Sequence, residues 1–332
     1  MPPSLLDTFR ALASFDPPRR SLAGAPWEEY VDWAIAQGLA PLAAYGLEYR
    51  LAGGGAPEWV RDRLLSVYQG SLNDNVMKLV NFKRAVGEVE GERVVVVGGA
   101  SFAEALYPHV AFRPVLEIQL LVPQPSLAAL FRALGQAEFR PDARAAEEAG
   151  AGVAHVLSDG RTPVVVRTSL LGPGRAAAEE ALLKRLLPMR VNGPSAFRLD
   201  VEDAILALCL EHAREGYQLP LISFVDLREL LLGAPSLGGP YSRAPDFQAL
   251  RARAKEWRLE RALWASVSVA ARLFPELEVA ASQARPELRG ATRQLLERLV
   301  VDPVSVPGRM RLVRGADRLR RLLVGGAGGS RS

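Results

Sequence analysis

Residues 94–123 read VVVVGGASFAEALYPHVAFRPVLEIQLLVP, and this stretch decides the fold prediction for the chain. Its first four residues are a β-branched run of the kind that forms a buried strand. Gly98 and Gly99 then indicate a tight turn, and residues 101–108 favour a helix that Pro108 ends. Residues 115–122 favour a second strand. The sequence therefore predicts strand, glycine turn, helix and strand in close succession.

Alternation along this second strand would divide its side chains between two faces. One face would carry Val115, Glu117, Gln119 and Leu121, and the other Leu116, Ile118, Leu120 and Val122. Two carboxylates at positions i and i+2 of a strand can hold a divalent metal together with substrate phosphates. The second acidic position is here an amide, Gln119. The strand alone leaves three interpretations open: a working metal site, a damaged one, or a strand without chemistry.

The surrounding sequence extends this unit and flanks it with helices. A helix is expected from Ser126, as its cap, to near Gly135, followed by strands at 152–158 and 162–170 that Asp159-Gly160 joins as a hairpin turn. Residues 93–170 thus predict an α/β unit of about four strands and two helices. Apolar residues at helical spacing predict helices through 1–90 and again from 175 onward. In the long helix that Pro57 opens, the polar residues 73–75 are expected to be exposed, with a position facing a cleft as the alternative.

Composition argues against a secreted protein, a membrane-spanning protein and a zinc protein. We find no signal peptide and no apolar run long enough for a membrane span, which predicts a cytoplasmic location. Cys209 is the only cysteine and falls on an apolar helical face, where a buried packing residue is expected. His212 is expected to be a packed, hydrogen-bonded histidine. His109 and His155 have no ligand-like spacing around them, so no zinc site is predicted.

Positive charge is concentrated at the end of the chain. The protein has a net charge of +4, and residues 302–332 carry seven Arg against Asp302 and Asp317. The rest of the chain is therefore close to neutral, which does not predict a general nucleic-acid binder. We interpret the tail as a solvated basic helix, with docking of residues 309–331 to a partner or an anionic surface as the alternative.

The stretch 94–123 resembles the bacterial family of uncharacterised nucleotidyltransferases, whose fold is of the DNA polymerase β type. The matching positions are Gly99, Leu106, Tyr107, Pro108, Arg113, Pro114, Ile118, Leu120, Leu121 and Val122. The likeness covers most of 35–275. It implies an α+β fold, with a small mixed-sheet core at 91–175, helical regions at 1–90 and 176–300, and a basic tail at 301–332.

The resemblance also implies where a site would lie, and three departures affect it. The family typically has a lysine before the glycine, and this chain has Gly98 there. The family's three metal-binding acids correspond to Glu117, Gln119 and Val165 of this chain. Only Glu117 is still acidic, and it is the one candidate catalytic residue. Glu104 and Asp159 are other acids nearby in sequence. The ligand-binding positions expected from the likeness are Gly98, Gly99, Ser101 and Arg113. For Arg113 an equal alternative is that it fixes the loop before the strand through hydrogen bonds to carbonyl groups.

These departures predict a nucleotidyltransferase-fold protein with an eroded metal site, which acts by binding a nucleotide or a protein partner rather than by catalysis. Each acid replaced by a neutral group removes an attraction of roughly 4 kcal/mol for a unit charge at about 4 Å. No cofactor is expected for this function. The alternative is an active enzyme that uses Mg²⁺ and a nucleoside triphosphate to transfer a nucleoside monophosphate to a small molecule or a protein.

Overall fold

The computed structural model describes residues 3–15, 21–50, 55–89, 91–143, 155–172, 174–190, 195–233, 240–286, 294, 297–298, 300–306, 309–313, 319–320 and 323. The chain divides into two compact units. Residues 71–204 form the sheet unit, and residues 1–70 together with 205–332 form the helical unit.

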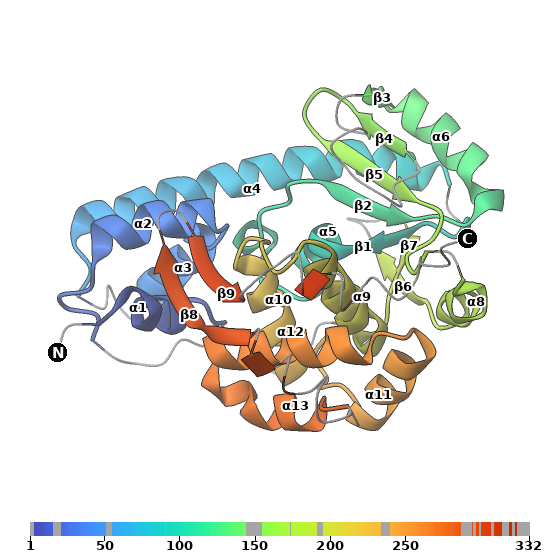
Figure 1. The fold of residues 1–332 in the computed structure, drawn as a ribbon. Coiled ribbons are helices and arrows are strands. Elements are labelled where there is room, and N and C mark those ends of the chain that lie inside the picture. Colours follow the sequence, from blue (N-terminus) through green and yellow to red (C-terminus); the bar gives the residue numbers. More distant parts are fainter. Residues whose placement is uncertain are drawn as a thin grey trace. The chain divides into compact units, whose positions relative to one another are not determined.

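The sheet unit contains a seven-stranded mixed sheet in the order β3-β4-β5-β2-β1-β7-β6 among the residues described (Figure 1). β1 pairs antiparallel with β2 and parallel with β7, and β2 pairs parallel with β5. The strands are β1 (Val95–Val97), β2 (Ile118–Leu121), β3 (Arg140–Pro141), β4 (His155–Ser158), β5 (Pro163–Arg167), β6 (Leu187–Arg190) and β7 (Ser195–Arg198).

Helices of the sheet unit follow the strands closely in sequence. α5 (Gly98–Ala105) begins directly after β1, and α6 (Leu127–Gln136) lies between β2 and β3. The remaining helical elements are η2 (Val110–Phe112), η3 (Gln124–Ser126) and α8 (Ala176–Lys184), together with the second part of α4 (Glu58–Gly87). The mixture of sheet and helix confirms the predicted α+β class.

The core of the sheet unit explains why the strands form where they do. Ile118, Leu120 and Val122 alternate into one apolar cluster with residues of α4, α5 and α6, as the period of two predicts. Leu116 was expected on this face and is instead 67% exposed, while Val115 joins the cluster. The prediction failed because the strand begins at Ile118, so the alternation does not extend back to Leu116.

The sheet is larger than the four strands predicted. Residues 187–190 and 195–198 were expected to be helical, yet they form the antiparallel pair β6 and β7, and β7 extends the sheet beside β1. β3 adds two residues at the other edge. The turn at Asp159-Gly160 between β4 and β5 is confirmed: Gly160 has φ +84°, and Asp159 Oδ1 accepts the backbone N–H groups of Arg161 and Thr162.

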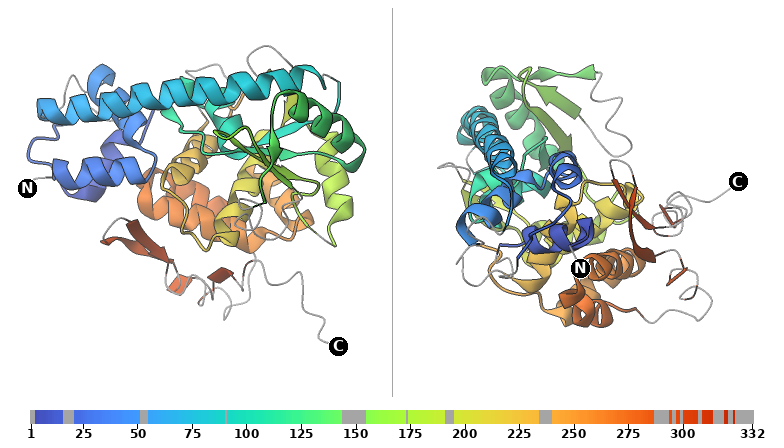
Figure 2. Two further views of the ribbon diagram at one scale, coloured as in Figure 1. Left: turned by 90° about the horizontal axis from the view of Figure 1, so that it is seen from above. Right: turned by 90° about the vertical axis from the view of Figure 1, so that its left-hand side faces the viewer.

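The helical unit brings the two ends of the chain into one body. Its helices are α1 (Leu5–Leu12), α2 (Trp27–Ala36), α3 (Ala40–Tyr45), η1 (Gly46–Arg50), the first part of α4, most of α9 (Val201–Arg214), α10 (Ile222–Leu232), α11 (Phe247–Glu256), α12 (Glu260–Leu273), η5 (Pro275–Leu277) and α13 (Glu278–Gln283) (Figure 2). Among the helices described, none combines the length and the apolar character that crossing a bilayer requires.

Buried polar groups are a feature of this unit. Cys209 is fully buried, as predicted, and burial raises the pKa of its thiol to about 12. His212 is fully buried as well, stacks on Phe224 and lies 3.1 Å from Ser223 Oγ through Nε2. This confirms the packed histidine. The Nδ1 atom of the same ring has no hydrogen-bond partner among the described residues.

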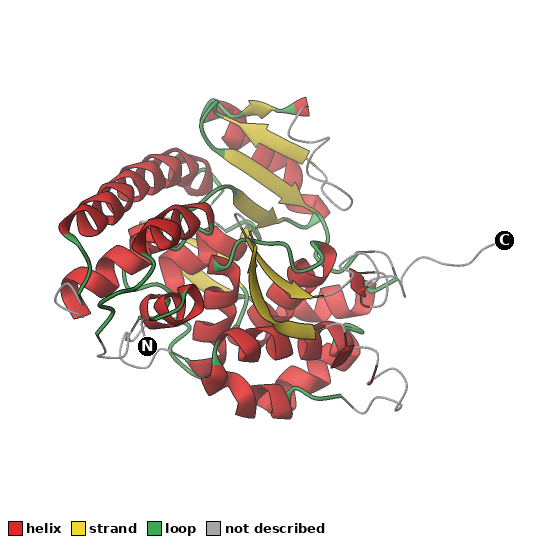
Figure 3. Cartoon of the chain, turned by 60° about the vertical axis from the view of Figure 1, so that its left-hand side comes forward, coloured by secondary structure: helices red, strands yellow, loops and turns green. Residues whose placement is uncertain are grey.

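The end of the chain differs from the helix predicted for it. β8 (Val300–Val306) and β9 (Arg309–Val313) pair antiparallel as a separate two-stranded sheet (Figure 3). A run of β-branched residues at 300–306 favours a strand and outweighs the helical interpretation of the arginines that follow. Most of residues 314–332 lie outside the described residues, so docking through this tail remains a prediction.

Candidate functional site

The candidate site lies where β1 ends and α5 begins. Gly98 has φ +62°, a conformation that residues with a Cβ rarely adopt. A Cβ at this position would lie 3.2 Å from Gln119 Oε1, so the Gln119 side chain packs directly against the glycine. The N-cap residue Val97 makes no side-chain capping hydrogen bond at the start of α5. The glycine turn predicted from the sequence therefore leads without a loop into a helix N-terminus, which favours anions.

Arg113 covers the second glycine. A Cβ added at Gly99 would lie 2.7 Å from Arg113 Nη1, closer than real Cβ atoms approach, so only glycine leaves room for the guanidinium. Nη1 also donates to the carbonyl oxygen of Pro114 at 2.7 Å. Arg113 is only half-buried and therefore retains access to solvent. Two residues expected to bind a ligand, Gly99 and Arg113, are thus brought together, with Gly98 adjacent.

The two positions expected to hold a metal are hydrogen-bonded to each other. Gln119 Nε2 donates to Glu117 Oε1 at 2.6 Å, and both side chains are half-buried. An amide nitrogen carries no lone pair for a metal, so this hydrogen bond occupies a carboxylate oxygen that a cation would need. The sheet register sets Gln119 opposite Val97 on one side and Val165 on the other. Val165 is 2% exposed and cannot be a ligand.

Other acids do not replace the missing ligands. Partial burial alone would raise the pKa of Asp159, but hydrogen bonds from Asn81, Thr162 and Arg161 outweigh it and hold that pKa below its usual value. Burial raises the pKa of Glu104, and nearby Lys83 opposes the shift. Asp74 pairs with Lys78 at 2.5 Å. Within the described part of the chain, no group of three or more His, Cys, Asp or Glu residues is placed to hold a metal ion.

The donor set therefore does not fit the metal pair that the fold family implies. Two-metal phosphoryl transfer needs several carboxylate oxygens around the ions, because Mg²⁺ prefers charged oxygen ligands in octahedral geometry. This site offers one carboxylate, and an amide N–H already donates to it. Beside this pair lie Gly98, against which Gln119 packs, and Gly99, which the Arg113 guanidinium covers.

A polar stripe on α4 fixes the segment that carries Arg113, and the sequence prediction missed it. Asn75 is 1% exposed; its amide nitrogen donates to the carbonyl oxygens of Val110 and Arg113, and its oxygen accepts the N–H of Val115. Ser71 Oγ donates to Ala111 O, and Lys78 Nζ donates to Val115 O. The expectation that Asn75 is exposed was wrong. The detectable signal was polar residues at positions 71, 75 and 78, which helical periodicity places on one face.

Ser101 lies apart from these groups. Its side chain is 1% exposed, and its Oγ lies 3.9 Å from Met189 Sδ on β6. It thus packs inside the sheet unit. The predicted cap of α6 behaves similarly: Ser126 occupies the cap position, but its hydroxyl donates to Glu92 Oε2 at 2.6 Å and makes no capping hydrogen bond.

Comparison with protein-family models gives one match, to a family described as uncharacterised nucleotidyltransferase, over residues 23–275. This range covers most of the chain and includes the whole candidate site. The chain belongs to this family. Its core is accordingly that of a nucleotidyltransferase-like protein, as the resemblance at residues 94–123 predicted. Neither the curated proteins nor the solved structures yield a significant match.

Membership in the family sharpens the meaning of the altered positions. The family match covers residues 117–165, so the amide at Gln119 and the valine at Val165 are features of a nucleotidyltransferase-like core rather than of an unrelated sheet. The positions that hold the glycines and Arg113 still form one surface.

Proposed function

We propose that this protein binds a nucleotide through its phosphates and does not catalyse nucleotidyl transfer. The observation that carries the proposal is the hydrogen bond from Gln119 to Glu117, with Val165 at the third expected acid. Binding is independent of divalent metal, because the contacts to phosphate come from the protein alone.

The phosphate contacts follow from the start of α5. The first N–H groups of a helix have no partners within it, and the N-cap residue Val97 makes no side-chain hydrogen bond to them. Two glycines without Cβ atoms let phosphate oxygens approach these N–H groups closely. Arg113 adds a guanidinium, which pairs with phosphate through charge-assisted hydrogen bonds. Together these groups supply binding and orientation, and neither attack nor departure of a phosphate is assisted.

Calorimetric titration with ATP, GTP, CTP and UTP tests this function, each with Mg²⁺ and with EDTA. We expect one nucleotide to bind with similar affinity in both conditions. Arg113→Gln is expected to weaken that affinity about tenfold, because a charge-assisted phosphate contact is lost. Arg93→Gln is the matched control, since Arg93 is an exposed arginine of the same unit.

Two results would contradict the proposal. Release of pyrophosphate from the bound triphosphate, at a rate that Glu117→Gln abolishes, would show an active transferase. Absence of binding for all four nucleotides would show that the surface at Gly99 and Arg113 has no nucleotide ligand, and a protein partner would become the better hypothesis.

A further inference from the structure

A cavity of about 610 Å³ lies in the helical unit, between α11, α12 and the end of α13. Its lining is Arg251, Ala254, Lys255, Glu260, Arg261, Leu263, Ala284, Arg285 and Pro286. The volume falls within the range typical of small-molecule sites, roughly 300–1,000 Å³. All these residues belong to one unit, so the cavity does not depend on how the two units are arranged.

The charges around this cavity are unbalanced. Among the described lining residues, four cationic side chains stand against the single carboxylate of Glu260. Arg285 is paired with Glu297 at 2.6 Å. In the described part of the chain, Arg251, Lys255 and Arg261 make no ion pair and no hydrogen bond, and all three side chains are exposed. Three neighbouring cations that have no partner among the described residues create a positive potential that attracts anions.

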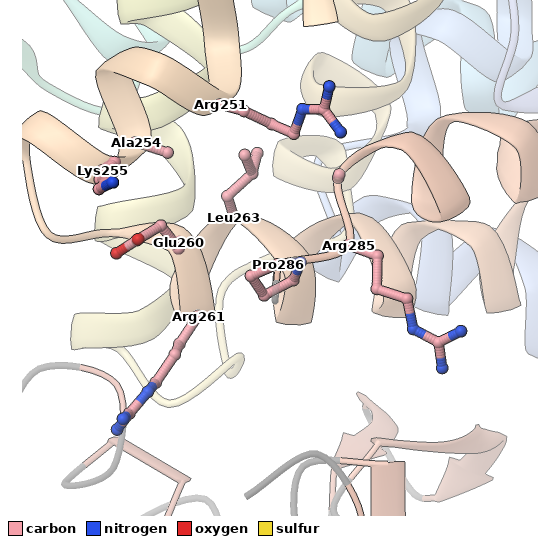
Figure 4. Close-up of a pocket in the computed structure, with 9 residues that line it drawn as sticks. Arg251, Ala254, Lys255, Glu260, Arg261, Leu263, Arg285 and Pro286 are labelled. Atoms are coloured by element: carbon pink, nitrogen blue, oxygen red, sulfur yellow. The ribbon is translucent and has the colours of Figure 1, made fainter. Parts of the chain in front are cut away.

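The arrangement indicates the kind of anion. Arg251 and Lys255 project from α11 and Arg261 from the first turn of α12, and Figure 4 shows the three side chains apart from one another rather than converging on one point. Ala254, Leu263 and Ala284 are buried and form an apolar floor. Cations at the rim and apolar groups at the base suit a ligand with several phosphate groups, and a single small anion could contact only part of the rim.

We infer that this cavity, which we call the α11–α12 pocket, binds a small molecule bearing two or more phosphate groups. The inference is separate from the proposed nucleotide site at Gly99 and Arg113. Arginine and lysine supply the charge-assisted hydrogen bonds that phosphate oxygens accept, and no metal ion is required. A free oligophosphate and a phosphorylated organic molecule share this chemistry.

The sequence provides a built-in reporter for the pocket. The chain has four lysines: Lys78, Lys83, Lys184 and Lys255. Lys255 lines the pocket, whereas Lys184 is 70% exposed on α8 of the other unit and pairs with Glu180. Acetylation of the folded protein followed by mass spectrometry reads both lysines in one sample. Inorganic tripolyphosphate is expected to protect Lys255 at least about fivefold and to leave Lys184 unchanged, because only a bound anion shields a lysine selectively.

A charge-removal variant gives a second readout. The triple variant Arg251→Gln, Lys255→Gln, Arg261→Gln is expected to weaken tripolyphosphate binding about tenfold or more in calorimetry, since three phosphate contacts are lost. The matched control removes three exposed arginines of α4, Arg61→Gln, Arg63→Gln and Arg84→Gln, and thereby keeps the same net charge. Equal weakening in both variants would show that general charge attraction causes the binding, and it would contradict the inferred phosphate site.

The source of the phosphate is distinguished by two further arms, in which tripolyphosphate is replaced by ATP or by fructose 1,6-bisphosphate. Stronger protection of Lys255 by an organic phosphate than by tripolyphosphate would show that the apolar floor contacts the organic part of the ligand. Equal or weaker protection would assign the pocket to free oligophosphate. No protection of Lys255 by any of the three compounds would contradict the inference. Arg113→Gln leaves Lys255 protection unchanged, so failure of the nucleotide proposal and failure of this one are distinguishable.

Discussion

The candidate site of the sheet unit and the α11–α12 pocket differ in whether their charged side chains have partners within the protein. At the first, Glu117 accepts a hydrogen bond from Gln119, and Arg113 donates to the backbone of Pro114. At the second, Arg251, Lys255 and Arg261 have no partners among the described residues. A hydrogen bond within the fold orients Glu117 and Arg113, and the Arg113 guanidinium keeps further N–H donors for a ligand. The α11–α12 pocket has no such contacts to its three cations among the described residues, and it is the more strongly charged of the two sites.

The same contrast appears among buried polar groups. In the sheet unit, Asn75 uses both its amide nitrogen and its oxygen on the segment 110–115. In the helical unit, His212 is fully buried with Nδ1 unsatisfied among the residues described, and burial lowers its pKa to about 3. A buried group with all its hydrogen bonds stabilises one conformation, whereas a group with one missing partner reduces stability.

The largest effect is expected from Asn75→Ala. The change leaves the Val115 N–H and two carbonyl oxygens without partners, and unpaired buried groups of this kind cost roughly 2–4 kcal/mol together. Urea unfolding measures the loss. Asn73→Ala is the matched control, because Asn73 is exposed on the same helix, and its effect is expected to stay below about 0.5 kcal/mol. Equal effects of the two changes would show that the polar stripe does not fix the segment 110–115.

A pH-dependent effect is expected next, from His212. Its pKa is lower in the folded state than the ordinary value of 6.5, so protons bind preferentially to the unfolded chain. Stability from this group is complete above about pH 6.5 and is lost as the pH falls toward 3. Between pH 6.5 and pH 5 the loss is about 2 kcal/mol.

Urea unfolding at pH 7, 6 and 5 tests this expectation against the variant His212→Gln. The variant is expected to be less stable at pH 7 and to show a flatter dependence on pH. His155→Gln serves as the control, because His155 is exposed and its removal leaves the slope unchanged. A slope identical in the protein and in His212→Gln would show that another group is responsible.

A smaller effect separates the two glycines of the candidate site. Gly98→Ala forces a Cβ into a backbone conformation with φ +62°, which costs about 1–2 kcal/mol. Gly99→Ala meets only the end of a flexible arginine side chain, so its effect on stability is expected to be under about 1 kcal/mol. Gly99→Ala is expected to weaken nucleotide affinity more than Gly98→Ala does, since the guanidinium of Arg113 must move. Thermal unfolding and calorimetry measure the two quantities, and the reverse order would contradict the placement of Arg113.

Sequence patterns predicted the centre of the fold better than its edges. β1, α5 and β2 follow from a β-branched run, a glycine pair and period-two alternation, all of which are local signals. β6 and β7 were missed because residues 187–198 have weak strand character and become strands by pairing beside β1. The prediction that Leu116 lies on the buried face was wrong because the strand starts at Ile118. Sequence patterns do not locate a strand boundary to within two residues.

The candidate site was predictable only in part. The likeness at residues 94–123 pointed to the glycines, Arg113, Glu117 and Gln119 as site positions, and their binding role stays a prediction. It did not predict the hydrogen bond between Gln119 and Glu117, which depends on side-chain conformation. The contact of Asn75 with Val115 could not be predicted, because the two residues are far apart in the sequence. The α11–α12 pocket was not predicted at all, because basic residues on an exposed helix are common and only the unpaired state of Arg251, Lys255 and Arg261 makes these ones distinctive.

The most direct test of the central claim is nucleotide titration of the purified protein with and without Mg²⁺, with pyrophosphate release followed in the same samples. An eroded metal site predicts binding of one nucleotide with an affinity that EDTA does not change, and no pyrophosphate release. Binding that requires Mg²⁺ and is accompanied by pyrophosphate release would contradict the claim, because Glu117 and Gln119 would then still hold a working metal.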